Sequence, residues 1–184
     1  NSTCEKLIPQ IPTTQTPGTS NCFLGDAPTA PAAWLLKGNA GTDGGVTDFL
    51  GTTDAVDLVL KTNNIPILKM DTNGNITAND VTNNAAAGNN SFACGQETAA
   101  IGQFSFAANY QSGATGYASA ALNQSSATGV ASLAANLGLA YGGNSVAIGE
   151  VTTAHGTASF TAGGYTTATS IYETAVGAYN VPLT

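Results

Sequence analysis

A short segment recurs seven times in the second half of the chain, and this repetition constrains the fold more than any other feature. Successive copies begin 14, 14, 13, 13, 14 and 14 residues apart. Repeats this short and regular indicate a solenoid, in which each copy forms one coil of two short strands and two turns. We therefore predict an all-β fold, a parallel β-roll or β-solenoid whose seven coils stack at about 4.8 Å and extend over roughly 35 Å. The copies begin at Ser91, Ser105, Ser119, Ser132, Ser145, Ser159 and Glu173.

One column of the repeat contains only glycine and asparagine. It lies four residues after the start of each copy. These residue types enter the left-handed backbone region more readily than others, so the column predicts a turn at the same place in every coil. The seven predicted turn residues are Gly95, Asn109, Asn123, Asn136, Gly149, Gly163 and Gly177.

Each copy alternates between large and small side chains in a way that is typical of a strand. In the first copy, Phe92 and Cys94 share one face, and Ala93 lies on the opposite face. The equivalents of Ala93 are alanine in every later copy except one, which has Thr161. We expect the larger residues to form the core columns. The flat alanine face is then expected to pack against a copy of the same chain.

The charge of the chain excludes several functions. Only 8% of the residues are charged, against about 25% in average globular proteins, and the formal net charge is −7. All four lysines precede residue 70, and there is no arginine. Nucleic-acid binding requires clustered cations, so we predict no nucleic-acid partner. No apolar run approaches the roughly 20 residues that a membrane-spanning helix needs, so we predict that the chain does not span a membrane.

The composition divides the chain into three parts. Residues 1–31 contain five of the seven prolines and are interpreted as a Pro/Thr-rich arm or linker. Cys4 and Cys22 flank most of this segment and are candidates for a disulfide. In residues 32–83, short apolar runs alternate with Gly/Asn turns, which indicates a small β-rich module. Residues 84–184 are assigned to the seven-coil repeat domain.

Two segments resemble known families. The run from Asn144 to Glu150 (NSVAIGE), followed by Ala154 and Gly156, resembles the head repeats of trimeric autotransporter adhesins (the YadA-like family), and the likeness extends over 88–184. It implies a left-handed parallel β-roll, a homotrimer and a role in adhesion. Upstream, the order W…GNAGT…FLGTTD…TNN within about 34–80 resembles a module of bacterial and phage tail-fibre-like proteins that precedes a shaft.

No residue is predicted to serve catalysis, a cofactor or a metal ion. Asp71, Asn73 and Asn75 have the alternate spacing of a calcium loop, but Gly74 stands at the fourth position instead of the sixth. An Asn-Gly hairpin turn explains this segment better. His155 is the only histidine and is interpreted as a solvated turn residue. The repeats carry only three side-chain carboxylates, too few for a catalytic cluster, so we predict that the protein is not an enzyme.

The preferred hypothesis is a structural and adhesive fibre subunit, located outside the cell on a cell or virion surface. Three parallel chains would bind a glycan or protein receptor through several weak sites at once. Two alternatives are a purely structural shaft or decoration protein, and an ice-binding solenoid. The candidate receptor contacts are exposed tyrosines, which combine an apolar ring with a polar tip; the same residues would also serve to pack subunits or turns. They are Tyr110, Tyr117, Tyr141 and Tyr165.

Overall fold

The computed structural model describes residues 49–79 and 83–180. The chain divides into two compact units, Asn1–Leu50 and Gly51–Thr184, and nearly all of the described residues belong to the second. The predicted arm at 1–31, with Cys4 and Cys22, lies outside the described residues. All strands of the described residues belong to the second unit.

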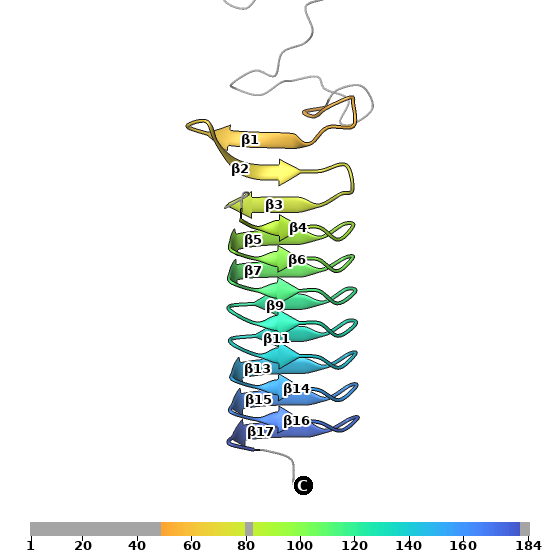
Figure 1. The fold of residues 1–184 in the computed structure, drawn as a ribbon, viewed down its shortest axis with the longest axis vertical. Coiled ribbons are helices and arrows are strands. Elements are labelled where there is room, and N and C mark those ends of the chain that lie inside the picture. Colours follow the sequence, from red (N-terminus) through yellow and green to blue (C-terminus); the bar gives the residue numbers. More distant parts are fainter. Residues whose placement is uncertain (1–48, 80–82, 181–184) are drawn as a thin grey trace, which may run out of the picture. The chain divides into compact units, whose positions relative to one another are not determined.

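Seventeen strands and no helix make up the regular structure of the described residues (Figure 1). Three strands precede the repeats: β1 (Leu58–Thr62), β2 (Ile65–Met70) and β3 (Ile76–Asn79). The longer strands of the coils are β5 (Phe92–Gln96), β7 (Phe106–Tyr110), β9 (Ala120–Leu122), β11 (Leu133–Ala135), β13 (Val146–Glu150), β15 (Phe160–Gly164) and β17 (Thr174–Ala178). Two-residue strands lie opposite them: β4 (Ala85–Ala86), β6 (Ala99–Ala100), β8 (Gly113–Ala114), β10 (Ser126–Ala127), β12 (Leu139–Ala140), β14 (Thr153–Ala154) and β16 (Thr167–Ala168).

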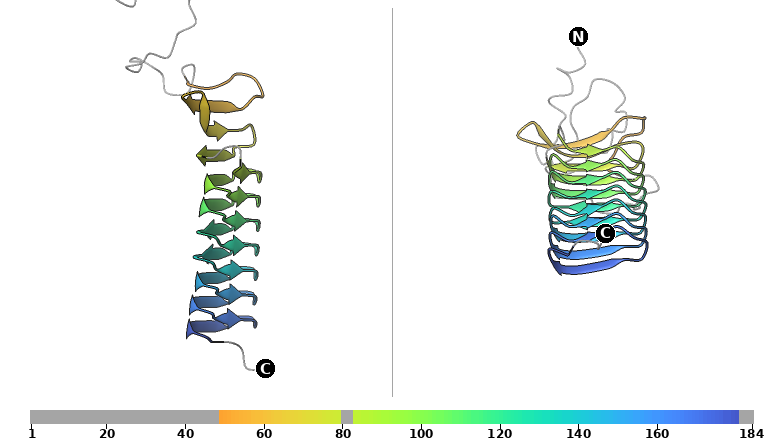
Figure 2. Two further views of the ribbon diagram at one scale, coloured as in Figure 1. Left: turned by 60° about the vertical axis from the view of Figure 1, so that its left-hand side comes forward. Right: turned by 60° about the horizontal axis from the view of Figure 1, so that its bottom comes forward.

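The strands form two sheets that face each other (Figure 2). The long sheet has ten strands in the order β1-β2-β3-β5-β7-β9-β11-β13-β15-β17, and the short sheet has seven, from β4 to β16. Within the repeats every pairing is parallel, and each repeat column pairs with itself, as in Ala121 with Ala134 and Ala134 with Ala147. This arrangement confirms the predicted parallel β-solenoid of about seven coils.

The interior of the coils is filled by small side chains: alanine between the two sheets, and serine and threonine in neighbouring buried columns. Ala93 of the long sheet and Ala100 of the short sheet are both fully buried, and so are their equivalents in the next four coils. The prediction that the alanine face lies outward is therefore wrong. A coil with only two short strands leaves a gap that admits small side chains, so the alanines point inward and the larger residues point outward.

All seven Gly/Asn turn residues have a positive φ, as their composition predicts. Asn123 and Asn136 have φ values of 54° and 55°, and Gly95 and Gly149 have values of 125° and 124°. A second set of glycines is required for a different reason. A Cβ on Gly129 would lie 2.0 Å from the carbonyl oxygen of Gly142 in the next coil, so stacking at this corner excludes every side chain.

Strand β3 joins the antiparallel hairpin to the stacked coils. It pairs antiparallel with β2 and parallel with β5, with Ile76 opposite Phe92. This register places Asn75 in the same column as Ser91. Residues 76–79, which the sequence assigned to the preceding module, therefore already form a coil strand, and the boundary expected at residue 83 does not interrupt the long sheet.

Candidate functional site

The outward surface of the long sheet is an apolar face. It consists of two columns, defined by the residues before and after each inward residue (alanine in six coils and Thr161 in one), and neither column contains a charged side chain. Phe106 is 38% exposed and Val176 is 57% exposed. The rings of Phe92 and Phe106 stack, with centroids 5.4 Å apart. The columns are Phe92, Phe106, Ala120, Leu133, Val146, Phe160 and Thr174, and Cys94, Ala108, Leu122, Ala135, Ile148, Ala162 and Val176.

Cys94 is a free thiol on this face. Partial burial raises its pKa above the ordinary value of 9.0, and a hydrogen bond with the Asn109 backbone acts in the opposite direction. The thiolate is the nucleophilic form, so a raised pKa keeps the sulfur protonated and unreactive near neutral pH. The expectation that Cys94 belongs to a core column is wrong, because it lies on the outward face and is only partly buried.

A recess interrupts the corner where the chain leaves the long sheet. Its cause is the two 13-residue steps in the repeat. Strands β9 and β11 have three residues each, whereas β7 and β13 on either side have five. The corner between Tyr110 and Glu150 is therefore cut back over two coils, which leaves a cavity of about 480 Å³.

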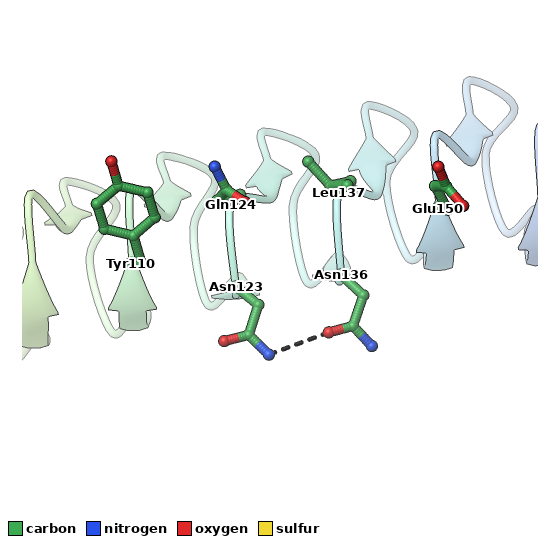
Figure 3. A pocket seen from close by; sticks show the side chains of 6 residues that line it. All are labelled: Tyr110, Asn123, Gln124, Asn136, Leu137 and Glu150. Atoms are coloured by element: carbon green, nitrogen blue, oxygen red, sulfur yellow. Dashed lines mark hydrogen bonds between the residues drawn. The ribbon is translucent and has the colours of Figure 1, made fainter.

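Six exposed side chains line the recess (Figure 3). In this view Tyr110, Gln124, Leu137 and Glu150 form one row across four coils, with an amide pair beside it. Asn123 Nδ2 donates a hydrogen bond of 3.0 Å to Asn136 Oδ1, so Asn136 Nδ2 and Asn123 Oδ1 stay available to a ligand. Backbone bonds hold the shortened corners in register, including Gln124 N–H to the Tyr110 carbonyl at 2.7 Å.

Glu150 is hydrogen-bonded to one tyrosine beyond the recess, and that tyrosine stacks on a second. The Tyr165 hydroxyl donates a hydrogen bond of 3.2 Å to Glu150 Oε1, and the Tyr165 ring stacks on Tyr179 with centroids 5.2 Å apart. The charge of Glu150, followed by this hydrogen bond, raises the pKa of Tyr165 above its ordinary value of 10.0. The carboxylate is thereby held at the edge of the recess.

The four tyrosines predicted as receptor contacts do not form one site. Tyr110 lies at the end of β7, in the recess, and Tyr165 follows β15 at the same corner. Tyr117 and Tyr141 follow strands of the short sheet. The ring of Tyr117 packs edge-on against Phe104 with centroids 5.6 Å apart, and the ring of Tyr141 stacks on His155 with centroids 4.8 Å apart. Sequence reasoning missed the other recess residues as a group, although the 13-residue steps marked their position.

Residues 71–75, which have the alternate spacing of a calcium loop, form a turn between β2 and β3. Asp71 Oδ1 accepts hydrogen bonds from the backbone N–H groups of Asn73 and Asn75, at 2.9 and 3.0 Å. Asp71 Oδ2 accepts one from Asn75 Nδ2 at 3.0 Å, and Gly74 has a φ of +77°. Its carboxylate is thus used within the turn. Across 49–79 and 83–180, no three or more His, Cys, Asp or Glu residues are grouped so as to hold a metal ion.

The outward face of the short sheet bears on the ice-binding alternative. Two of its coils present Ser126 with Thr128 and Thr167 with Thr169. Of the two coils between them, that of β12 presents Leu139 and Tyr141, and that of β14 presents Thr153 and His155. Threonines lie in successive coils only at Thr115 and Thr128 and at Thr153 and Thr167, so no continuous threonine ladder runs along this face, which does not favour ice binding.

Comparison with protein-family models, curated proteins and solved structures finds no match. Among the residues that the structure describes, none belongs to a helix with the length and hydropathy that a membrane crossing requires.

Proposed function

We propose that this chain is the subunit of a homotrimeric fibre outside the cell, on a cell or virion surface, and that the fibre acts in adhesion. The observation that carries the proposal is the apolar face. Its exposed side chains include Phe106, Ile148 and Phe160, and contiguous apolar surface of this kind commonly marks a protein interface.

A parallel copy of the same chain is the partner that best fits this face. The same columns recur in every coil, so a copy in register would repeat each contact along the stack. Many small contacts would then add up, as at other solenoid surfaces. The resemblance of the repeats to YadA-like heads supports three chains, and the tail-fibre-like segment upstream supports a place in a fibre.

The same geometry supports the proposed role in adhesion. A trimer presents each exposed corner of the coils three times, including the recess beside Tyr110. Linked weak sites bind a multivalent surface far more tightly than one site alone. A trimer that binds no surface would instead support the alternative of a purely structural shaft.

The test is the mass of the intact chain in solution, measured by light scattering at several concentrations. We expect a trimer. Val146→Glu places a charge on the apolar face and should yield monomers, because a buried unpaired charge costs several kcal/mol, on the order of 3–5. Thr153→Glu is the matched control, since Thr153 lies in the same coil on the outward side of the short sheet; it should stay trimeric.

Circular dichroism would establish that both variants keep their β-structure. A wild-type chain that is monomeric at all concentrations would overturn the trimer. Retention of the trimer on glycan-coated or cell-coated surfaces, with loss of retention for monomeric Val146→Glu, is the expected result for adhesion.

A further inference from the structure

We propose that the recess between Tyr110 and Glu150 binds an uncharged oligosaccharide. The inference rests on the proposed adhesive function, to which it adds the chemical class of the receptor. The recess has about 480 Å³ of space, within the range of small-molecule sites.

The size and openness of the recess favour an extended ligand. Tyr110 and Glu150 are separated by three coil steps, or about 14 Å along the stack. This is longer than a single sugar ring. All six lining side chains are exposed, so a chain of sugars can lie along the corner without entering a narrow opening.

The lining provides the two kinds of contact that a sugar requires. The aromatic ring of Tyr110 offers an electron-rich face on which the C–H groups of a pyranose can stack, and Leu137 adds apolar area. Asn136 Nδ2, Asn123 Oδ1 and the Gln124 side-chain amide offer donors and acceptors that no described residue uses. Hydroxyl groups both donate and accept, so they match such amides.

The charge of the site selects against acidic sugars. Glu150 is the only charged residue in the lining. All four lysines of the chain precede residue 70, and there is no arginine to pair with a carboxylate or sulfate. Glu150 Oε1 already accepts a hydrogen bond from Tyr165, which leaves Oε2 to accept one from a neutral hydroxyl.

The experiment uses the full chain on an array of neutral, sialylated and sulfated oligosaccharides, followed by NMR titration with a retained glycan. We expect retention of neutral glycans only, with shifts of the backbone amides of Asn123, Gln124, Asn136 and Leu137. Tyr110→Ala should weaken binding about five- to tenfold. Tyr141→Ala is the matched control, because Tyr141 is 42% exposed and Tyr110 is 43% exposed, and it should leave affinity unchanged.

Three results would overturn the inference: no neutral glycan retained, shifts confined to residues outside the recess, or equal effects of the two tyrosine variants. Melting curves of both variants would exclude unfolding as the cause. A trimer that adheres to cells without shifts in the recess would contradict the oligosaccharide site alone. A monomer that binds a neutral glycan in the recess would contradict the proposed fibre and leave the site intact.

Discussion

The side-chain oxygen of Asn75 accepts two hydrogen bonds from Ser91, one from the backbone N–H at 2.9 Å and one from the hydroxyl at 3.1 Å. Both residues are buried. Asn75 thus joins the end of the β2–β3 turn to the first repeat coil by hydrogen bonds. In a stack of coils each one is stabilised mainly by its neighbours, so this link protects the first coil from fraying.

Replacement of Asn75 by alanine should loosen the first coils. The buried Ser91 hydroxyl would lose its acceptor and the Ser91 N–H would keep only the Gly88 carbonyl, 3.1 Å away, at a cost of about 1–3 kcal/mol. Hydrogen exchange should accelerate in β3 and β5 and stay unchanged in β15 and β17. Asn73→Ala in the same turn is the control, because the structure uses only the backbone of Asn73. Equal exchange in both variants would show that Asn75 does not secure the coil.

The Asp71 carboxylate should make the stability of the first coils depend on pH. Partial burial tends to raise its pKa, but hydrogen bonds from Asn75 and Asn73 and the charge of Lys69 bring it below the ordinary value of 3.8. A carboxyl group with a lowered folded-state pKa stabilises the fold above its unfolded pKa. That contribution is lost as the pH falls through the folded value.

Exchange of the β3 amides should therefore accelerate as the pH falls below about 3.8, beyond the intrinsic change of exchange rate with pH. Asp71→Asn should reduce this extra acceleration and cost roughly 1 kcal/mol at neutral pH, a small value because the site is partly exposed to solvent. The same pH dependence in the variant and the wild type would assign the acid effect to another group.

The glycine corner gives a sharp contrast between two Gly→Ala substitutions. A Cβ at residue 129 would meet the Gly142 carbonyl at 2.0 Å, and the two coils would have to separate. We expect Gly129→Ala to lose at least about 2 kcal/mol of unfolding free energy in urea. A Cβ on Gly113 would meet no heavy atom within 4 Å, and Gly113 has no positive φ. Gly113→Ala should therefore leave the free energy of unfolding unchanged or raise it by up to about 1 kcal/mol. A similar loss at both positions would mean that the coils do not stack this closely.

The interior predicts a second contrast, between adjacent residues of β6. Ala100 is fully buried between the sheets, and Ala99 faces outward in the column where another coil carries Leu139. Ala100→Leu should destabilise by about 1–3 kcal/mol or more through overpacking, whereas Ala99→Leu should change stability by less than about 0.5 kcal/mol. The reverse order in thermal melts would place the alanines on the outside.

The coils and their turns could be predicted from the sequence, but the inward face of the strands and the recess could not. The period of the repeat and its Gly/Asn column were enough to predict the parallel coils and their positive-φ turns. Alternation placed Ala93 and Phe92 on opposite faces, but it could not say which face is inside, because that depends on the gap between the sheets. The 13-residue steps were visible in the sequence. That they produce a recess depends on where the missing residue falls, which is the corner after β9 and β11.

The position of the Glu150 carboxylate at the edge of the recess can be tested by titration of Tyr165. Because Glu150 is the main cause of its raised pKa, Glu150→Gln should lower the pKa of Tyr165 toward 10.0. The change would be followed by NMR of ¹³C-labelled tyrosine between pH 8 and 12, a window set by the ordinary tyrosine pKa of about 10. Glu97→Gln is the control, since Glu97 accepts its hydrogen bond from Gln111 in a different coil. An unchanged Tyr165 pKa in Glu150→Gln would mean that the carboxylate does not face this hydroxyl in solution, and the edge of the recess would then lack its fixed acceptor.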